Sequence, residues 1–281
     1  MQSLRELVTC GFVVSAVAVV SFLAPARAEE CPGNPNALGT SRVLTLPADL
    51  KQVGLMQYPQ TLPLADKEVV LTFDDGPLPP NSSKVLDILA AQCVKATFFL
   101  VGEMAREHPG AVRRIHDEGH TIGTHTEDHP LRMRKLTVEK LRWEIDQGIA
   151  DVTAALGDAK NLAPFFRIPG LERSPAIDEE LAARSLVVFS SDTVADDWHR
   201  HIRPTDIIAR ALKRLEARGK GILLLHDIHP ATVKALPGLL KDLKDKGFHV
   251  VHIIPAGSET VSLPSPPVAR SATPRPAGDR S

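Results

Sequence analysis

The segment LTFDDGP, residues 71–77, places two aspartates side by side at the point where an apolar run ends. A short apolar run that is followed by a Gly-Pro turn is typical of a buried β-strand. Two adjacent carboxylates at such a position are unfavourable unless a cation or a proton neutralises one of them. The pair Asp74 and Asp75 therefore indicates either a functional site at a strand end or a plain Asp-Gly turn.

Six further apolar runs follow along the chain, and helical patterns lie between them. The seven predicted strands cover residues 69–73, 96–101, 121–124, 165–167, 186–190, 222–225 and 249–254. The clearest helical patterns cover residues 82–92, 137–157 and 204–219. Ser82 or Ser83 is the expected N-cap of the first helix, and Thr137 lies near the cap of the second. Strands that alternate with helices predict an α/β fold with a parallel sheet, either open or closed into a barrel.

Polar residues follow the ends of five of these strands. They are Asp74 and Asp75, then His125 and His129, then Arg167, then Asp192, Asp196, Asp197 and Trp198, and finally His226 and Asp227. In parallel α/β folds the loops after the carboxyl ends of the strands share one face, and that face holds the site. The sequence therefore predicts that five distant segments meet in one pocket.

The segment HTEDH, residues 125–129, offers a candidate metal site. His125 and His129 are four residues apart, so a helical turn or a compact loop can bring both rings to one side. Two imidazoles and one carboxylate, with open positions left over, form a ligand set that is typical of a catalytic zinc ion. By itself the pair also fits two surface histidines, so the carboxylate from another strand end is what favours a metal.

The length and charge of the chain narrow the functional classes. The 281 residues are enough for one large domain with its own core. The formal net charge of −1 gives no indication of nucleic acid or an anionic membrane surface as a partner.

The two ends of the chain differ in composition from the middle. Arg5, the apolar residues 11–24 and the small residues up to Ala28 predict a signal peptide over residues 1–28. The mature protein would then be periplasmic or secreted, with no stable membrane span. An uncleaved anchor is the alternative, although the apolar run is short for a span. Residues 29–66 are expected to wrap the domain as an extension with one strand, and the Pro- and Ser-rich residues 255–281 to form a disordered tail.

Two cysteines, Cys31 and Cys93, would remain after cleavage of the signal peptide. An exported compartment permits a disulfide between them. Two free thiols, one of them buried in a helix, are equally compatible with the sequence, because sequence does not show their geometry.

Five motifs occur in an order that resembles a known family. TFDDGP, HTEDH, FFRIPGL, DTVADDW and LLLHD resemble the motifs of the polysaccharide deacetylases, the NodB-homology enzymes of carbohydrate esterase family four. TFDDGP followed by H-x3-H is the most specific part of the resemblance. The resemblance covers residues 67–254 and implies a catalytic domain with a distorted β/α barrel of about seven parallel strands, the number that the apolar runs also predict.

The resemblance implies a role for each matching position. Asp75, His125 and His129 would hold one divalent metal ion, with Zn²⁺ expected and Co²⁺, Ni²⁺ or Mn²⁺ as alternatives. Asp74 would act as the general base and His226 as the general acid of a hydrolysis.

The resemblance also implies supporting roles around these residues. Arg167 would keep the base ionised, with a surface or barrel-rim ion pair as the alternative, and Asp197 would orient the acid. Trp198 would line the sugar groove and Leu224 the acetyl pocket, although either could be a core residue. Asp227 could instead cap the helix that follows.

Two departures from the family pattern concern the substrate. Residues 168–171 read IPGL where the family usually has Pro-Pro-aromatic-Gly. Pro169, Gly170 and Leu171 are expected to contact substrate, with the amide of Gly170 or Leu171 as the oxyanion donor. Val194 stands where the family usually has an aspartate. Both changes bear on substrate fit more than on metal binding.

The expected function is that of a metal-dependent hydrolase. It would remove N-acetyl groups from an N-acetylglucosamine-containing glycan, either chitooligosaccharide or peptidoglycan, and release acetate. The alternatives are an O-acetyl esterase acting on a cell-wall glycan, a metal-free amidase of the same fold, and an inactive glycan-binding module. The complete set of ligands, base and acid argues against the last two.

Overall fold

The computed structural model describes residues 31–257, so the predicted signal peptide and the predicted tail beyond residue 257 lie outside the described residues. The strands are β1 (Thr40–Leu46), β2 (Gln52–Val53), β3 (Glu68–Asp74), β4 (Thr97–Leu100), β5 (Thr121–Thr124), β6 (Phe165–Phe166), β7 (Val187–Phe189), β8 (Thr193–Val194), β9 (Gly221–His226) and β10 (His249–Pro255). The helices are α1 (Asn81–Ala91), α2 (Gly102–Glu107), α3 (Pro109–Asp117), α4 (Val138–Leu156), α5 (Pro175–Ala183), α6 (Pro204–Arg218) and α7 (Pro230–Asp245). Within residues 31–257, none of these helices is both long enough and apolar enough to cross a membrane.

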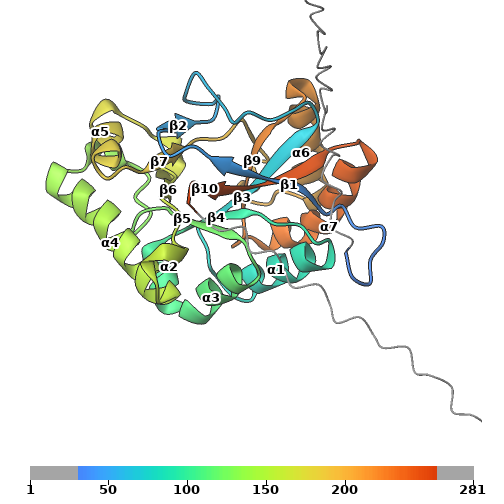
Figure 1. Cartoon of the computed structure of the whole chain (residues 1–281), viewed down its shortest axis with the longest axis horizontal. Coiled ribbons are helices and arrows are strands. Elements are labelled where there is room, and N and C mark those ends of the chain that lie inside the picture. The colour runs from blue at the N-terminus through green and yellow to red at the C-terminus, as the bar shows by residue number, and fades with distance from the viewer. Residues whose placement is uncertain (1–30, 258–281) are drawn as a thin grey trace, which may run out of the picture.

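Seven strands form a distorted parallel barrel. β3 pairs with β4 on one side and with β9 on the other, β4 continues through β5 and β6 to β7, and β9 pairs with β8. In the described part of the chain, β7 and β8 do not pair with each other, so the barrel is open there. The helices lie around the strands in the order α5, α4, α2, α3, α1, α7 and α6 (Figure 1). The seven strands predicted from the sequence are a slightly different set, β3 to β7, β9 and β10, and all of them are present. The predicted fold, a distorted β/α barrel, is confirmed.

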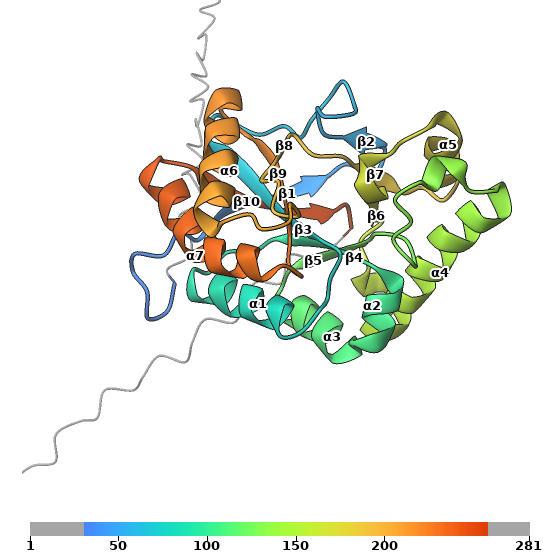
Figure 2. The same ribbon diagram turned by 180° about the vertical axis from the view of Figure 1, so that it is seen from behind.

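Strand β10 closes the amino-terminal end of the barrel. It pairs with only the first two residues of β3 and then leaves that strand to pair with β1. Farther along, the carbonyl of Ile253 accepts a hydrogen bond of 2.6 Å from the hydroxyl of Thr121, the first residue of β5. Val251 and Ile253 belong to the apolar cluster inside the barrel. Because β10 fills this end, the opposite end remains for a site; Figure 2 shows the barrel from behind.

The alternation of side chains along β3 decides which residues face the inside of the barrel. Leu71 and Phe73 belong to the outer apolar cluster that includes residues of the surrounding helices, whereas Val70 belongs to the inner one. Successive side chains of a strand point to opposite faces. Thr72 and Asp74 therefore point inward with Val70, and both are buried.

The segment before the barrel adds two strands and is tied to the barrel by a carboxylate. β1 pairs with β10, and β2 pairs with β7. Asp192 accepts hydrogen bonds from the Leu55 amide (2.8 Å), the Thr61 hydroxyl (2.5 Å) and the Ile222 amide (2.8 Å). A buried carboxylate with three donors is satisfied. Asp192 therefore anchors residues 55–61 to the barrel, and the prediction that it belongs to the pocket is wrong.

The predicted helix caps are confirmed in one case. The side chain of Thr137 accepts a hydrogen bond from the Lys140 amide (3.3 Å) at the start of α4. Neither serine caps α1, because Pro80 occupies the N-cap position and makes no side-chain cap bond. The Ser82 hydroxyl instead accepts a hydrogen bond from the Leu78 amide, at 2.7 Å.

The two cysteines form a disulfide, which decides between the two alternatives that the sequence leaves open. Cys31 and Cys93 have Cα atoms 5.6 Å apart and are separated by 62 positions in the chain. Cys93 lies just beyond the end of α1, and not within a helix. The bond therefore fastens the start of the described chain to the end of α1.

Removing this disulfide is expected to lower the free energy of unfolding by about 2–4 kcal/mol, because a long loop is no longer closed in the unfolded chain. Cys31→Ala, Cys93→Ala and the double variant should lose similar amounts in denaturant titrations, since each breaks the same bond. A loss in only one of the single variants would show that side-chain packing, and not the cross-link, is responsible.

Candidate functional site

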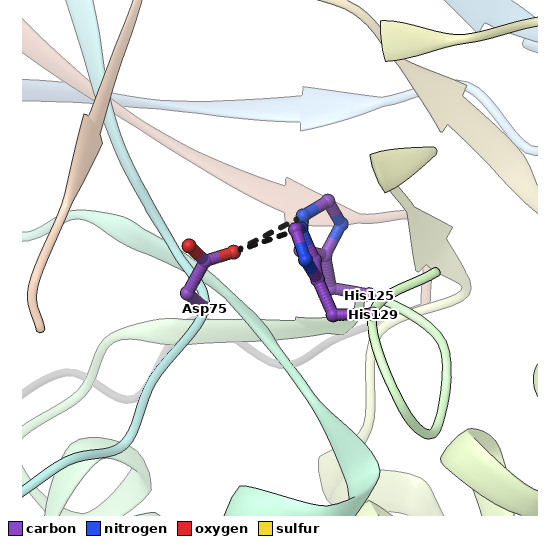
Figure 3. A group of neighbouring side chains, drawn as sticks. All are labelled: Asp75, His125 and His129. Carbon is purple, nitrogen blue, oxygen red and sulfur yellow. Dashed lines mark ion pairs between the residues drawn. The ribbon is translucent and has the colours of Figure 1, made fainter. Parts of the chain in front are cut away.

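Asp75 turns toward the inside of the barrel although alternation along the strand would point it outward. Its φ of 75° is left-handed, a conformation that aspartate tolerates better than most residues. The chain bends there, directly after β3, and Asp75 comes to lie beside Asp74 at the open end of the barrel. Figure 3 shows its carboxylate pointing at two imidazole rings.

Those rings belong to His125 and His129, which follow β5. Oδ1 of Asp75 lies 3.4 Å from Nε2 of His125 and 3.2 Å from Nε2 of His129. One ligand atom from each of the three residues lies within 4.8 Å of the other two. The loop after β3 and the loop after β5 therefore meet at one point, as the sequence predicts.

Hydrogen bonds hold the histidine loop in shape. The Thr126 hydroxyl accepts from the His129 amide (3.1 Å). Glu144 of α4, which is only 1 % exposed, accepts from the amides of Glu127 (3.2 Å) and Asp128 (3.0 Å). No pattern in the sequence singled out Glu144, because its partners are backbone amides from another segment.

The ring of His125 is oriented by a backbone carbonyl. Its Nδ1 lies 2.6 Å from the carbonyl oxygen of Arg167. A carbonyl only accepts, so Nδ1 carries a proton, and Nε2 is the ring nitrogen that remains to bind a metal ion beside Asp75. This is the tautomer that a metal ligand needs.

The donor set fits a divalent metal ion. Oδ1 of Asp75 is buried and has no hydrogen-bond partner in the described part of the chain. Two imidazole nitrogens and one carboxylate oxygen match the ligands of zinc sites with open positions. A cation between them would satisfy the buried oxygen.

The protonation states also suit metal binding. Burial would raise the pKa of Asp75, but contact with His125 and the charges of His226 and His129 outweigh it and hold the pKa well below its usual range. Burial, together with the neighbouring His125, lowers the pKa of His129 to about 4. Near neutral pH the carboxylate is therefore ionised and His129 is neutral, as ligands must be.

Asp74 is paired with an arginine inside the barrel. Nη1 of Arg167 donates to Oδ1 of Asp74 (2.6 Å) and to the hydroxyl of Thr72 (2.8 Å). The guanidinium also donates to the carbonyls of Phe189 (3.3 Å) and Ser190 (3.1 Å). Burial lowers the pKa of Arg167, and the facing carboxylate opposes this effect. Arg167 is 0 % exposed, so the alternative of a surface ion pair is wrong.

His226, the last residue of β9, is oriented by a buried carboxylate. Nδ1 of His226 lies 2.8 Å from Oδ1 of Asp197. Oδ2 of Asp197 accepts from the His226 amide (2.8 Å) and from the Thr232 hydroxyl (2.6 Å). Burial lowers the pKa of His226, but Asp197 and the charges of Asp75 and Asp74 outweigh it and raise the pKa to about 9. Its Nε2 faces Asp75, with 3.9 Å between Nε2 and Oδ2.

Trp198 and Leu224 lie next to His226 in different surroundings. The Trp198 ring is edge-on to the His226 ring with 5.5 Å between centroids, and the residue is 45 % exposed, so the alternative of a core tryptophan is wrong. Leu224 is buried two residues before His226 and therefore points into the barrel with it. Leu224 belongs to none of the apolar core clusters, and it pairs in register with Thr72.

The segment after Arg167 forms a tight turn. Pro169–Leu171 is a single 3₁₀ turn, and Gly170 and Leu171 have successive left-handed φ values of 60° and 54°. The Leu171 amide donates to the Ile168 carbonyl (3.0 Å). Of the two amides expected to stabilise an oxyanion, Leu171 is thus engaged within the turn, which leaves Gly170.

Two aspartates of the predicted convergence lie elsewhere or act differently. Asp196 pairs with Arg210 (2.9 Å) and Arg214 (2.8 Å) of α6 and is not part of the candidate metal group Asp75, His125 and His129. Asp227 is fully buried, and a Cβ on Gly76 would come within 2.3 Å of either of its oxygens. Asp227 does not cap α7, since residue 229 is the N-cap and makes no side-chain bond, so that prediction is wrong. Burial raises the pKa of Asp227 to about 7.

Comparisons with known proteins agree with this arrangement. Residues 62–186 match the family model described as polysaccharide deacetylase. The peptidoglycan-N-acetylglucosamine deacetylase PgdA of Listeria monocytogenes is 33% identical over 189 residues, which cover 67% of this chain and 38% of that protein. The chain thus spans well under half of that relative's length.

Two other relatives are matched over more of their length. A chitooligosaccharide deacetylase of Rhizobium leguminosarum bv. trifolii is 30% identical over 203 residues, which cover 65% of this chain and 88% of that protein. The solved structure of a peptidoglycan deacetylase of Bdellovibrio bacteriovorus superposes with a TM-score of 0.69 at 30% identity, covering 79% of this chain and 61% of that one. Motif order, barrel and matches agree, and the chain belongs to the polysaccharide deacetylase family.

Proposed function

We propose that this protein is a metal-dependent N-deacetylase that releases acetate from N-acetylglucosamine-containing glycans. The observation that carries the proposal is the meeting of Asp75, His125 and His129 beside a second carboxylate, Asp74, that an arginine holds. A metal ion bound by the three residues would polarise the acetamide carbonyl and lower the pKa of a water molecule.

Asp74 is the proposed general base. Its Oδ1 faces Arg167 at 2.6 Å, while Oδ2 lies 3.9 Å from Nε2 of His125. The guanidinium stabilises the ionised carboxylate, so Asp74 is ready to take a proton from the attacking water. It lies on the inner face of β3 beside the three proposed ligands, and we do not propose it as a ligand itself.

His226 is the proposed general acid. Its raised pKa of about 9 keeps the ring protonated near neutral pH, so it holds the proton that a departing amine needs. Asp197 fixes Nδ1, which leaves Nε2 as the donor. The Gly170 amide would stabilise the negative charge that develops on the acetyl oxygen.

The proposed substrate class follows from the site and the relatives together. The exposed ring of Trp198 beside His226 offers a face on which a sugar can stack, and buried Leu224 suits an acetyl methyl group. The relatives carry the names peptidoglycan-N-acetylglucosamine deacetylase and chitooligosaccharide deacetylase, and N-acetylglucosamine is common to both. We propose that the protein is exported, because a disulfide suits an oxidising compartment. Cleavage after Ala28 is proposed from the pattern of residues 1–28 in the sequence.

The proposal is tested by measuring acetate release from N-acetylated chitooligosaccharides and from peptidoglycan, before and after a chelator. Release from at least one substrate is expected to stop on chelation and to return when Zn²⁺ is added. Turnover that survives chelation would contradict the proposal. Release only from an O-acetylated glycan would indicate an esterase, and binding without release would indicate a glycan-binding module.

A further inference from the structure

We infer that Gln57, in the segment before the barrel, is a positioning residue for the turn Pro169–Leu171 and hence for the Gly170 amide. The inference rests on the proposed function, because that function gives the amide its task. The segment that contains Gln57 lies outside the stretch that matches the family model, which begins at residue 62. The sequence of the turn departs from the family pattern, so the contacts that stabilise it are expected to be particular to this chain.

The turn needs support from outside itself. Gly170 and Leu171 both have left-handed φ values, 60° and 54°. Glycine adopts this conformation freely, but a leucine side chain crowds the backbone there. A strained conformation of this kind persists when surrounding contacts hold it.

Gln57 makes the contact that reaches the turn. Its side-chain amide, Nε2, donates a hydrogen bond to the Leu171 carbonyl. Its own carbonyl accepts from Nη1 of Arg173 (3.1 Å), which follows the turn. Arg173 is held in turn by Asp178 (2.5 Å) and lies over the Tyr58 ring, 4.7 Å from its centroid. Residues 57 and 58 therefore contact the carboxyl end of the turn and the arginine that follows it.

Residues 55–58, which contain Gln57, are hydrogen-bonded to the barrel. The Met56 amide donates to the Ser191 carbonyl (2.9 Å), and the Leu55 amide donates to Oδ1 of Asp192 (2.8 Å). Tyr58 is buried and belongs to the same apolar cluster as Ile168, the residue before the turn. Gln57 thus connects the barrel wall after β7 with the turn after β6.

Displacement of the turn would affect the chemistry more than the binding of substrate. An oxyanion forms only as the reaction proceeds, so a donor that is misplaced lowers kcat and leaves KM nearly unchanged. The turn also touches the metal side of the site, because a Cβ on Gly170 would lie 3.7 Å from Cδ2 of Leu131, two residues after His129.

The test compares Gln57→Glu with Gln60→Glu. Each substitution keeps the shape of the side chain and replaces a donating amide by a carboxylate that cannot donate. Gln60 is the matched control, because its Nε2 donates to the Gln52 carbonyl (2.9 Å) in the same segment, and no contact joins Gln60 to the turn. On N-acetylated chitooligosaccharide, Gln57→Glu is expected to lower kcat about tenfold or more, with KM within about twofold, whereas Gln60→Glu keeps the wild-type kcat.

Hydrogen–deuterium exchange gives a readout that does not depend on activity. Amides of residues 168–172 should exchange faster in Gln57→Glu than in the wild type, and at the wild-type rate in Gln60→Glu. Equal kcat in Gln57→Glu and wild type, or equal losses in the two variants, would overturn the inference. If the wild type releases no acetate from any glycan, the proposed function fails, and the exchange rates alone decide whether Gln57 holds the turn.

Discussion

Replacing Asp74 with asparagine is expected to lower kcat for acetate release by about 10²–10⁴-fold, the usual contribution of a general base. The amide cannot take the proton of the attacking water, although its oxygen can still accept the hydrogen bond from Arg167. Metal affinity should stay close to that of the wild type, because Asp74 is not among the three proposed ligands. Kinetics on N-acetylated chitooligosaccharide and a Zn²⁺ titration check the two parts separately.

Stability must be measured alongside, because the change leaves Arg167 without its charged partner inside the barrel. Breaking a buried ion pair in this way costs about 3–5 kcal/mol. Asp196→Asn is the matched control, since Asp196 also pairs with arginines, Arg210 and Arg214, but does not belong to the proposed metal site. A kcat in Asp74→Asn that equals the wild-type value would show that another group takes the proton.

Most of the barrel could be predicted because its strands are regular in the sequence. Each of the seven strands is a short apolar run with a helical pattern between it and the next. The alternation of residues along β3 then directs Asp74 inward and Phe73 outward. The polar residues at the carboxyl ends of the strands meet for the same reason, since parallel strands place those ends together.

The features that could not be predicted depend on contacts between distant segments. β2 and β8 have two residues each and, unlike the equally short β6 with Phe165 and Phe166, they contain no apolar run. The left-handed φ of Asp75 changes the direction of its side chain, and no alternation pattern reveals that. The position of Asp192 after a strand predicts that it joins the site, yet its three donors come from the extension and from β9. The sequence therefore predicts the strand end at which a side chain lies. The residues that the side chain contacts depend on how distant segments pack together.

Replacing Asp75 with alanine is expected to abolish metal binding in the micromolar range and to reduce acetate release to background. Asp75 would supply one of the three proposed ligands, and its buried Oδ1 lies within 3.4 Å of both ring nitrogens. Changes to residues that only orient ligands cost roughly 10–100-fold in metal affinity, so loss of a ligand itself should cost more. Calorimetric titration of the metal-free protein with Zn²⁺ measures this directly, without any glycan.

Asp128→Ala is the matched control for this prediction. Asp128 lies between His125 and His129 in the chain, but its carboxylate is half exposed and pairs with Lys140 (3.3 Å), so it should not contribute to binding. The two variants therefore remove the same charge, and only one of them removes a proposed ligand. Wild-type metal affinity in Asp75→Ala, or an equal loss in Asp128→Ala, would show that the cation is not held by the three residues that meet at the end of β3. The assignment of Asp74 as the base beside that cation would then lose its support.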